Sequence, residues 1–120
     1  MIDYSSAGEW ADQVHALAII ESGEDETAIG DNGCAFGVLQ NHPDFFVNYY
    51  RPPVDGPDTW TTAQIKAAAN FLSMWEPSLT LDGAIQSFHL GISAYRREGK
   101  RDIDYLTRFT EALQRVRSGK

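Results

Sequence analysis

The feature that most constrains the fold is a series of segments in which apolar residues recur every three or four positions. The first such segment predicts a helix from about Ala7 to Glu21, because its apolar residues fall on one helical face. Gly23 is the expected stop of this helix. The inner face is expected to comprise Trp10, Val14, Leu17, Ala18 and Glu21.

Four further segments are also predicted to be helical. Pro43 near a first turn predicts a short helix over residues 43–50. Thr61 and Gln64 resemble a capping box, which predicts a helix that starts there and ends before Pro77. Two more helices are expected over about 81–88 and 102–115. The inner faces of the last three helices are expected to carry Ile65, Ala68, Ala69, Leu72 and Trp75, then Ala84, Ile85 and Phe88, then Ile103, Leu106, Phe109 and Leu113.

The segment 28–40 interrupts the helical pattern. Glycines fall at positions 30, 33 and 37, and Asp31-Asn32-Gly33 is a strong turn signal flanked by short apolar pieces. This segment predicts a small β-hairpin or an irregular loop. The sequence as a whole therefore predicts a mainly α fold, with several short helices around one core, in a single domain over residues 1–120.

Composition argues against several functions. The chain has 120 residues, 42% of them apolar, and its single cysteine, Cys34, cannot form an internal disulfide. His15, His42 and His89 are far apart and no cysteine pair accompanies them, so neither a metal site nor a cofactor is expected. The net charge is −7 and no basic stripe is present, which argues against nucleic-acid binding.

The positive charges are gathered in the last quarter of the chain, while the first half carries most of the acids. Solvated helix faces are the simplest interpretation, and the alternative is that this polarity orients the domain on an anionic polymer. The basic residues concerned are Arg96, Arg97, Lys100, Arg101, Arg108, Arg115, Arg117 and Lys120.

Glu21 is the strongest candidate for a catalytic residue. It ends the apolar face of the first helix, so burial and the negative end of the helix dipole both disfavour its ionised form. We therefore expect a raised pKa and a carboxyl group that stays protonated near neutral pH. A general acid that protonates a glycosidic oxygen needs this state. On spacing alone, an ordinary solvent-facing glutamate in a last turn is the alternative.

The residues around Glu21 fit a wider pattern. Glu21-Ser22-Gly23 is followed by Ala28-Ile29-Gly30, then by Gly37-Val38-Leu39-Gln40 and Pro43. This order resembles the signature of goose-type lysozymes and soluble lytic transglycosylases, in which a Glu-Ser pair ends a helix and a Gly-x-x-Gln stretch follows on the cleft wall. Residues 64–72 (QIKAAANFL), 84–95 (AIQSFHLGISAY) and 105–113 resemble later motifs of that family. The chain is also similar to small phage muramidases, and the resemblance implies a lysozyme-like fold.

The resemblance also implies roles for residues other than the general acid. Gln40 would hydrogen-bond an N-acetyl sugar, and Ser22 would orient a sugar or the catalytic carboxyl group. The family's Tyr-Asn-Ala-Gly appears here as Phe88-His89-Leu90-Gly91, so His89 stands where an amide would contact substrate. Tyr95, at the end of this segment, is the remaining expected substrate contact. The alternative roles are a helix-end hydroxyl bonded to a carbonyl for Ser22 and a structural histidine for His89.

A second carboxylate decides the type of reaction. An inverting hydrolase needs a base that activates water, with its two carboxyl groups roughly 6.5–9.5 Å apart. Asp31 at the predicted turn is the best candidate for this base, although an aspartate before Asn-Gly is also what a turn favours. Without such a base, the resemblance implies a lytic transglycosylase, in which the sugar's own 6-hydroxyl group attacks.

These observations predict a muramidase that cleaves the bond between N-acetylmuramic acid and N-acetylglucosamine in the glycan strand of peptidoglycan. Hydrolysis is slightly favoured over the lytic transglycosylase reaction, which leaves 1,6-anhydro ends. The sequence is also compatible with a domain that has lost catalysis and only binds glycan, and with a chitinase-like activity on the same fold. The protein is expected to be a monomer that acts at the bacterial cell wall.

The start of the chain bears on how the protein would reach a cell wall. Met1-Ile2-Asp3 has no basic residue, and the apolar run over residues 16–20 is too short for a signal peptide or a membrane span. We therefore expect no signal peptide and no membrane span. The expected origins are a phage-encoded enzyme, a virion-associated enzyme or a domain of a larger secreted protein.

Overall fold

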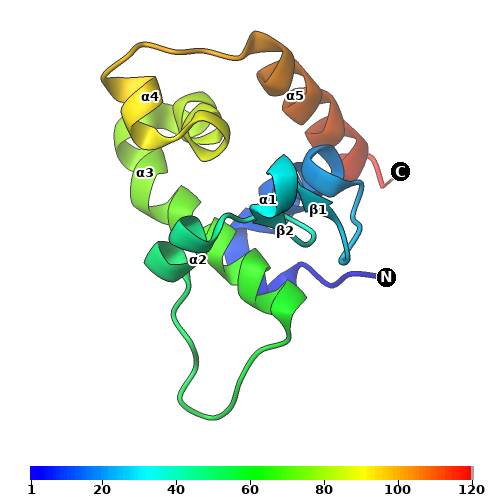
Figure 1. Ribbon diagram of the computed structural model, residues 1–120. Coiled ribbons are helices and arrows are strands. Elements are labelled where there is room, and N and C mark those ends of the chain that lie inside the picture. The colour runs from blue at the N-terminus through cyan, green and yellow to red at the C-terminus, as the bar shows by residue number, and fades with distance from the viewer. Residues whose placement is uncertain (120) are drawn as a thin grey trace.

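The computed structural model describes residues 1–119, in which helices surround one core and a small hairpin projects from them (Figure 1). The expected mainly α fold is confirmed. In chain order the elements are the 3-10 helix η1 (Ser5–Trp10), α1 (Ala11–Ser22), β1 (Ile29–Gly30), the 3-10 turn η2 (Asp31–Gly33), β2 (Ala35–Phe36), α2 (Pro43–Tyr49), α3 (Trp60–Leu90), α4 (Ile92–Arg96) and α5 (Ile103–Arg117). Within the described chain, none of the helices has the length and apolar character needed to span a membrane.

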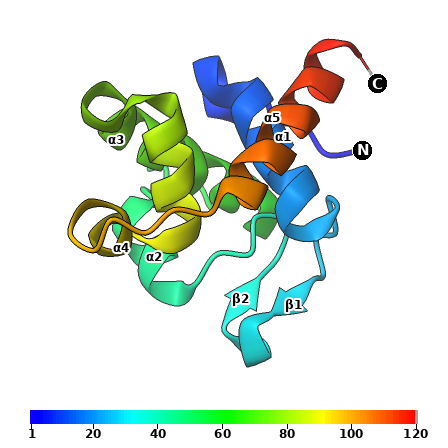
Figure 2. The same cartoon turned by 90° about the horizontal axis from the view of Figure 1, so that it is seen from above.

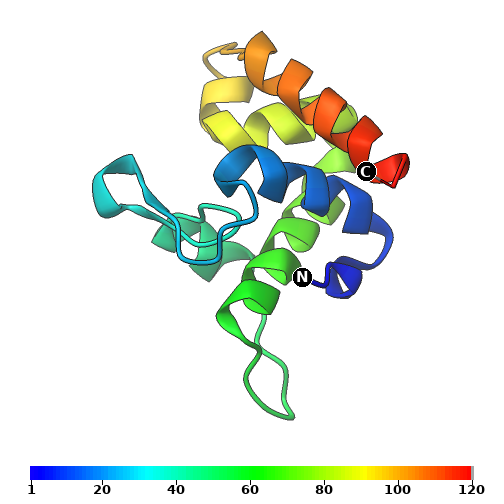
Figure 3. The same ribbon diagram turned by 90° about the vertical axis from the view of Figure 1, so that its right-hand side faces the viewer.

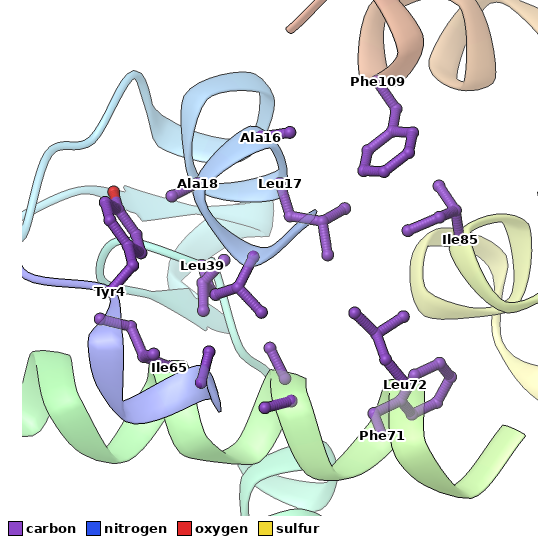
Figure 4. Packing of buried hydrophobic residues seen from close by; sticks show 14 of the residues in the cluster. Tyr4, Ala16, Leu17, Ala18, Leu39, Ile65, Phe71, Leu72, Ile85 and Phe109 are labelled. Carbon is purple, nitrogen blue, oxygen red and sulfur yellow. The ribbon is translucent and has the colours of Figure 1, made fainter. Parts of the chain in front are cut away.

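Helix α1 packs against η1, α3 and α5, and its apolar face forms the middle of the core. Leu17 of α1 is fully buried and lies in the same interior space as Phe109 of α5 and Ile85 of α3 (Figure 4). Gly23 ends the helix in the left-handed conformation at φ 64°, as predicted from the sequence. The predicted start was wrong, because a kink at Gly8 (φ 60°) makes residues 5–10 a separate 3-10 helix.

Helix α3 differs from the prediction at its start and in its middle. Its N-cap is Thr59, whose side chain accepts a hydrogen bond from the backbone N–H of Thr62, so the capping box expected at Thr61 is wrong. Pro77 lies inside the element rather than beyond its end, and the helical conformation breaks at Thr80 (φ 66°). The second part therefore starts at residue 81, where a separate helix was expected.

The final helix, α5, begins one residue later than expected because Asp102 is its N-cap and accepts a hydrogen bond from the backbone N–H of Tyr105 at 3.0 Å. Phe109 is buried as predicted. Ile103 was expected in the core and is 63% exposed, whereas Tyr105 is only 2% exposed. The inner face of α5 is therefore rotated from the predicted one, and this rotation brings a tyrosine hydroxyl group into the interior.

The predicted hairpin forms within residues 28–40. Strands β1 and β2 pair antiparallel, with Ile29 opposite Phe36 and Gly30 opposite Ala35, and the turn η2 connects them. Figures 2 and 3 show this hairpin projecting away from the helices. The short helix α2 follows with Pro43 in its first turn, as expected. Helix α4 was not predicted, since its five residues are too few to show a helical apolar pattern.

Candidate functional site

A cavity of about 570 Å³ lies where the end of α1, the hairpin, α2 and the end of α3 meet. It brings together Glu21, Asp31, Gln40 and His89, four of the six site residues predicted from the sequence. Its lining residues are Glu21, Asp31, Ala35, Leu39, Gln40, Asn41, His42, Phe45, Tyr49, Phe71, Ser87, Phe88, His89, Leu90, Gly91 and Ile92. Its size suits a small-molecule or sugar ligand.

Glu21 lies in the last turn of α1 and lines this cavity, partly buried. Burial is the main reason that the pKa of its carboxyl group is raised above the ordinary value. The hydroxyl group of Tyr105 donates a hydrogen bond of 2.5 Å to Oε2 of Glu21, and this bond lowers the pKa of Glu21. The nearby Asp31 carboxylate adds a smaller upward influence on the same pKa. The carboxyl group is thus fixed in orientation while its protonated form is favoured.

Tyr105 is itself held in place by a cluster of polar side chains. The ring of His89 stacks on the Tyr105 ring, with 3.9 Å between ring centroids and planes 5° apart. Nε2 of His89 lies 2.9 Å from Oδ2 of Asp102. Hydrogen bonding, first from the backbone N–H of Tyr105 and then from His89, lowers the pKa of Asp102. His89 therefore touches the cavity and also supports the residue that holds Glu21.

Buried Gln86 connects this cluster to α3. Its amide nitrogen donates to the backbone carbonyl of Asp102 and its amide oxygen accepts from the backbone N–H of Asp102, both at 2.9 Å. Gln86 is only 2% exposed, so these two bonds form in a water-poor environment where they fix geometry well. These two bonds fix the position at which α5 begins, and therefore where Tyr105 lies relative to Glu21.

Asp31 lies on the turn η2 and reaches the cavity from the hairpin side. Its Oδ2 lies 2.8 Å from Nε2 of His42. Both side chains are largely exposed, so the pair is open to solvent and to a ligand in the cavity. Asp31 has φ 50°, the left-handed conformation that aspartate accepts more readily than most residues, so it also serves the turn.

Gln40 lines the cavity, and its side chain faces the hairpin. Its amide nitrogen donates hydrogen bonds to the carbonyl oxygens of Ala28 at 3.1 Å and Gly37 at 2.8 Å. Both amide hydrogens are therefore engaged within the protein. Gln40 ties the two ends of the hairpin together at the wall of the cavity, which is a positioning role that the sequence pattern did not indicate.

Gln64 of α3 holds the same cavity wall, the segment around Gln40, in place. It is fully buried, accepts a hydrogen bond from the backbone N–H of Leu39 and donates one to the carbonyl of Phe36, both at 3.0 Å. A Cβ on Gly37 would collide with the Gln64 amide group, so only glycine fits at that position. The Gly-x-x-Gln stretch therefore owes its shape to a residue that the sequence had suggested as a helix cap.

Ser22 and Tyr95 do not line the cavity. The Ser22 hydroxyl group donates to the carbonyl oxygen of Val38 at 2.6 Å and accepts from the backbone N–H of Asp25, so it anchors the end of α1 to the Gln40 wall. Tyr95 lies on α4, with the Arg101 guanidinium 3.7 Å above its ring. Both side chains therefore bond or stack within the protein, and their expected substrate contacts stay predictions.

The far end of the cavity is aromatic. Phe45 and Tyr49 of α2 line it, and Phe45 packs edge-on against Phe88 with 5.2 Å between ring centroids. Asn41 and Ser87 also line the cavity, and each has a buried side-chain oxygen without a partner in residues 1–119. The sequence pattern gave no signal for Asn41 or Ser87.

Neither a metal centre nor a known relative identifies the chemistry of this site. Among residues 1–119, no group of three His, Cys, Asp or Glu side chains is placed to hold a metal ion. Searches against protein-family models, curated proteins and solved structures find no match for this chain. The chemistry of the site therefore follows from its own residues.

Proposed function

We propose that the protein is a muramidase that cleaves the glycan strand of peptidoglycan, with Glu21 as the general acid. The observation that carries this proposal is a carboxyl group with a raised pKa on the wall of a cavity large enough for sugar units. A protonated carboxyl group in this setting can donate its proton to the glycosidic oxygen as the bond to the leaving sugar breaks. The family resemblance of the sequence supplies the substrate class.

Hydrolysis requires a base that activates water, and Asp31 is the residue proposed for this role. It lies on the same cavity as Glu21 and is close enough for its charge to raise the pKa of Glu21. Its exposure leaves room for a water molecule beside it. In this mechanism Glu21 protonates the leaving oxygen while Asp31 accepts a proton from water on the opposite face of the sugar.

The pairing of Asp31 with His42 favours a second candidate, a lytic transglycosylase. Nε2 of His42 contacts one oxygen of the Asp31 carboxylate, so that oxygen is not free to take a proton from water. The 6-hydroxyl group of the muramic acid would then attack in place of water, which gives a 1,6-anhydro end. Glu21 is the acid in both reactions, so its removal stops both of them. The sugar ends of the products distinguish the two reactions.

The first experiment is a digestion of purified peptidoglycan, followed by mass spectrometry of the sugar ends. We compare the wild type with Glu21→Gln and with Glu111→Gln, an exposed glutamate of α5 that serves as the matched control. Loss of a general acid typically lowers the rate by about 10²–10⁴-fold. We expect that loss for Glu21→Gln and an unchanged rate for Glu111→Gln.

The ends that form identify the reaction. Reducing N-acetylmuramic acid ends support hydrolysis and predict a further large loss in Asp31→Asn. Anhydro ends support the transglycosylase reaction and assign Asp31 to the turn. If wild-type protein binds the glycan and cleaves no wall type tested, the catalytic proposal is overturned and a glycan-binding domain takes its place.

A further inference from the structure

A cluster of basic side chains borders the cavity on the side of Leu90 and Ile92. We call Arg96, Arg97, Lys100 and Arg101 the basic rim; they lie at the end of α4 and in the segment that leads to α5, along the edge of the molecule (Figure 1). One surface hollow beside the cavity is lined by Ile92, Ser93, Arg96 and Arg97. Another is lined by Leu90, Lys100, Arg101, Asp102, Ile103 and Asp104, so two acidic residues stand beside its two bases. Ile92 and Leu90 also line the cavity itself, so the three depressions adjoin.

Two of these cations are held against aromatic rings. The Arg101 guanidinium lies 3.7 Å from the centroid of the Tyr95 ring and donates to the carbonyl oxygens of Tyr95 and Lys100. The Arg96 guanidinium lies 5.8 Å from the centroid of the Trp75 ring. Stacking on a ring orders a flexible arginine without neutralising its charge. Arg96 and Arg101 are therefore positioned before any ligand arrives.

The arginines of the basic rim also lack acidic partners. Lys100 forms an ion pair with Glu98 at 3.3 Å, but no ion pair links Arg96, Arg97 or Arg101 to a carboxylate of the described chain. This is unexpected in a protein with 17 acidic and 10 basic residues, because acids are abundant enough to pair with every base. The hollow lined by Arg96 and Arg97 has no acidic residue in its lining, so it is a local positive site on an acidic molecule and attracts anions to the side of the cavity at Ile92.

We propose that the basic rim binds the carboxylates of the peptide stems carried by the glycan strand in the cavity. This inference rests on the proposed function and adds a substrate requirement to it. A stem is attached to the sugar itself, so its carboxylates must lie near the cavity, and the rim adjoins the cavity through Leu90 and Ile92. Guanidinium groups match the planar, two-oxygen geometry of a carboxylate.

The test measures binding separately from cleavage. The parent protein carries Glu21→Gln, so it does not cut the polymer during a co-sedimentation experiment. We compare its affinity for teichoic-acid-free sacculi that carry stems with its affinity for the same glycan after an amidase has removed the stems. Arg96→Gln/Arg97→Gln is the test variant, and Arg51→Gln/Arg115→Gln removes the same charge from exposed positions away from the cavity.

We expect the test variant to bind stem-bearing sacculi about tenfold more weakly than the parent at low salt, since each exposed charge pair contributes modestly. High salt should erase this difference. Binding to stem-free glycan should be unchanged in the test variant, and the control variant should match the parent on both polymers. If the double variant unfolds at a lower urea concentration than the parent, the single variant Arg97→Gln, at an exposed side chain, replaces it in the binding experiment.

Each outcome separates this inference from the proposed function. Equal binding of the test variant and the parent to stem-bearing sacculi overturns the inference, as does an equal loss in the control variant. A loss that appears only when teichoic acids are present also overturns it, because the ligand is then a phosphate. If the rim discriminates stems while protein with Glu21 intact cleaves nothing, the inference stands and the muramidase proposal fails.

Discussion

The protonation of Glu21 is decided by a few neighbours that act in opposite directions. Burial raises its pKa most, and the hydrogen bond from Tyr105 is the largest influence that lowers it. The charges of His89 and Arg108 also lower it. A general acid needs both conditions, because burial favours the protonated form while the hydrogen bond and charges keep proton release possible. Tyr105 is the neighbour that can be changed with the least disturbance of shape.

Removing the Tyr105 hydroxyl group should shift the pH dependence of activity. Its hydrogen bond stabilises the charged form of Glu21, so Tyr105→Phe raises the pKa of Glu21 further. Glu21 then stays protonated to a higher pH. We expect the alkaline limb of the profile of kcat/KM against pH to move upward, with a lower maximum because the carboxyl group is less well oriented.

Tyr50→Phe is the matched control for this prediction. The Tyr50 hydroxyl group also donates to a carboxylate, Oδ2 of Asp58 at 2.7 Å, but neither residue lines the cavity. The control should leave both limbs of the profile in place. An alkaline limb that moves downward in Tyr105→Phe, or that moves equally in both variants, contradicts the assignment of Glu21 as the acid.

The sequence predicted some site residues and missed others for a physical reason. Glu21 could be recognised because its signal is local, a carboxyl group at the end of an apolar helical face. The contact of Tyr105 with Glu21 could not be predicted, because it joins positions 84 residues apart and depends on the rotation of α5 about its axis. Asn41 and Ser87 become notable only when burial leaves an oxygen without a partner.

At the scale of elements, helix existence was predicted better than helix ends. Apolar spacing located all the longer helices, because their buried faces repeat over several turns. The break in α3 occurs at Thr80 rather than at Pro77, since proline bends a helix without always ending it. Gln64 shows a related limit: its spacing from Thr61 fits a cap, but its side chain points inward and bonds the hairpin wall.

Gln64 should therefore contribute strongly to stability. Gln64→Leu keeps a similar volume but leaves the backbone N–H of Leu39 buried without a partner, while the carbonyl of Phe36 keeps the hydrogen bond from the backbone N–H of Asn41. An unpaired buried group costs about 1–3 kcal/mol. We expect the free energy of unfolding, measured in urea, to fall by about 1–3 kcal/mol, since one such group loses its partner.

Gln114→Leu, on the exposed side of α5, is the control for Gln64→Leu. Exposed substitutions of this kind usually change stability by less than about 0.5 kcal/mol. A loss below about 1 kcal/mol in Gln64→Leu would show that water reaches the backbone N–H of Leu39. The wall of the cavity would then owe its shape to Gln40 and Ser22 rather than to α3.

At the scale of the whole molecule, burial of the Glu21 carboxyl group lowers the free energy of unfolding. The end of α1 holds Glu21 between the core and the cavity, and the same burial that favours its protonated form disfavours the folded state whenever the group is ionised. Carboxyl groups with lowered pKa values, such as Asp58 and Asp102, act in the opposite sense and favour folding above their ordinary titration range. Acidic residues thus both stabilise this protein and limit its stability.

Glu21→Gln should accordingly make the protein more stable near neutral pH. The folded-state pKa of Glu21 lies above the unfolded value of about 4.3, so its unfavourable contribution is absent at low pH and grows as pH rises from the unfolded pKa to the folded pKa. Glutamine keeps the shape and removes the charge. We expect equal free energies of unfolding at pH 3 and a gain of about 0.5–2 kcal/mol in the variant at pH 7.

The difference between the two proteins isolates Glu21, because the contributions of Asp58 and Asp102 are present in both and cancel. Urea unfolding of wild type, Glu21→Gln and Glu111→Gln across pH 3–8 provides the measurement, and Glu111→Gln should follow the wild type throughout. A variant that is less stable than the wild type at pH 7 means that the Glu21 carboxylate is favourably held by Tyr105, His89 and Arg108. Glu21 would then be ionised at that pH and unable to act as the acid.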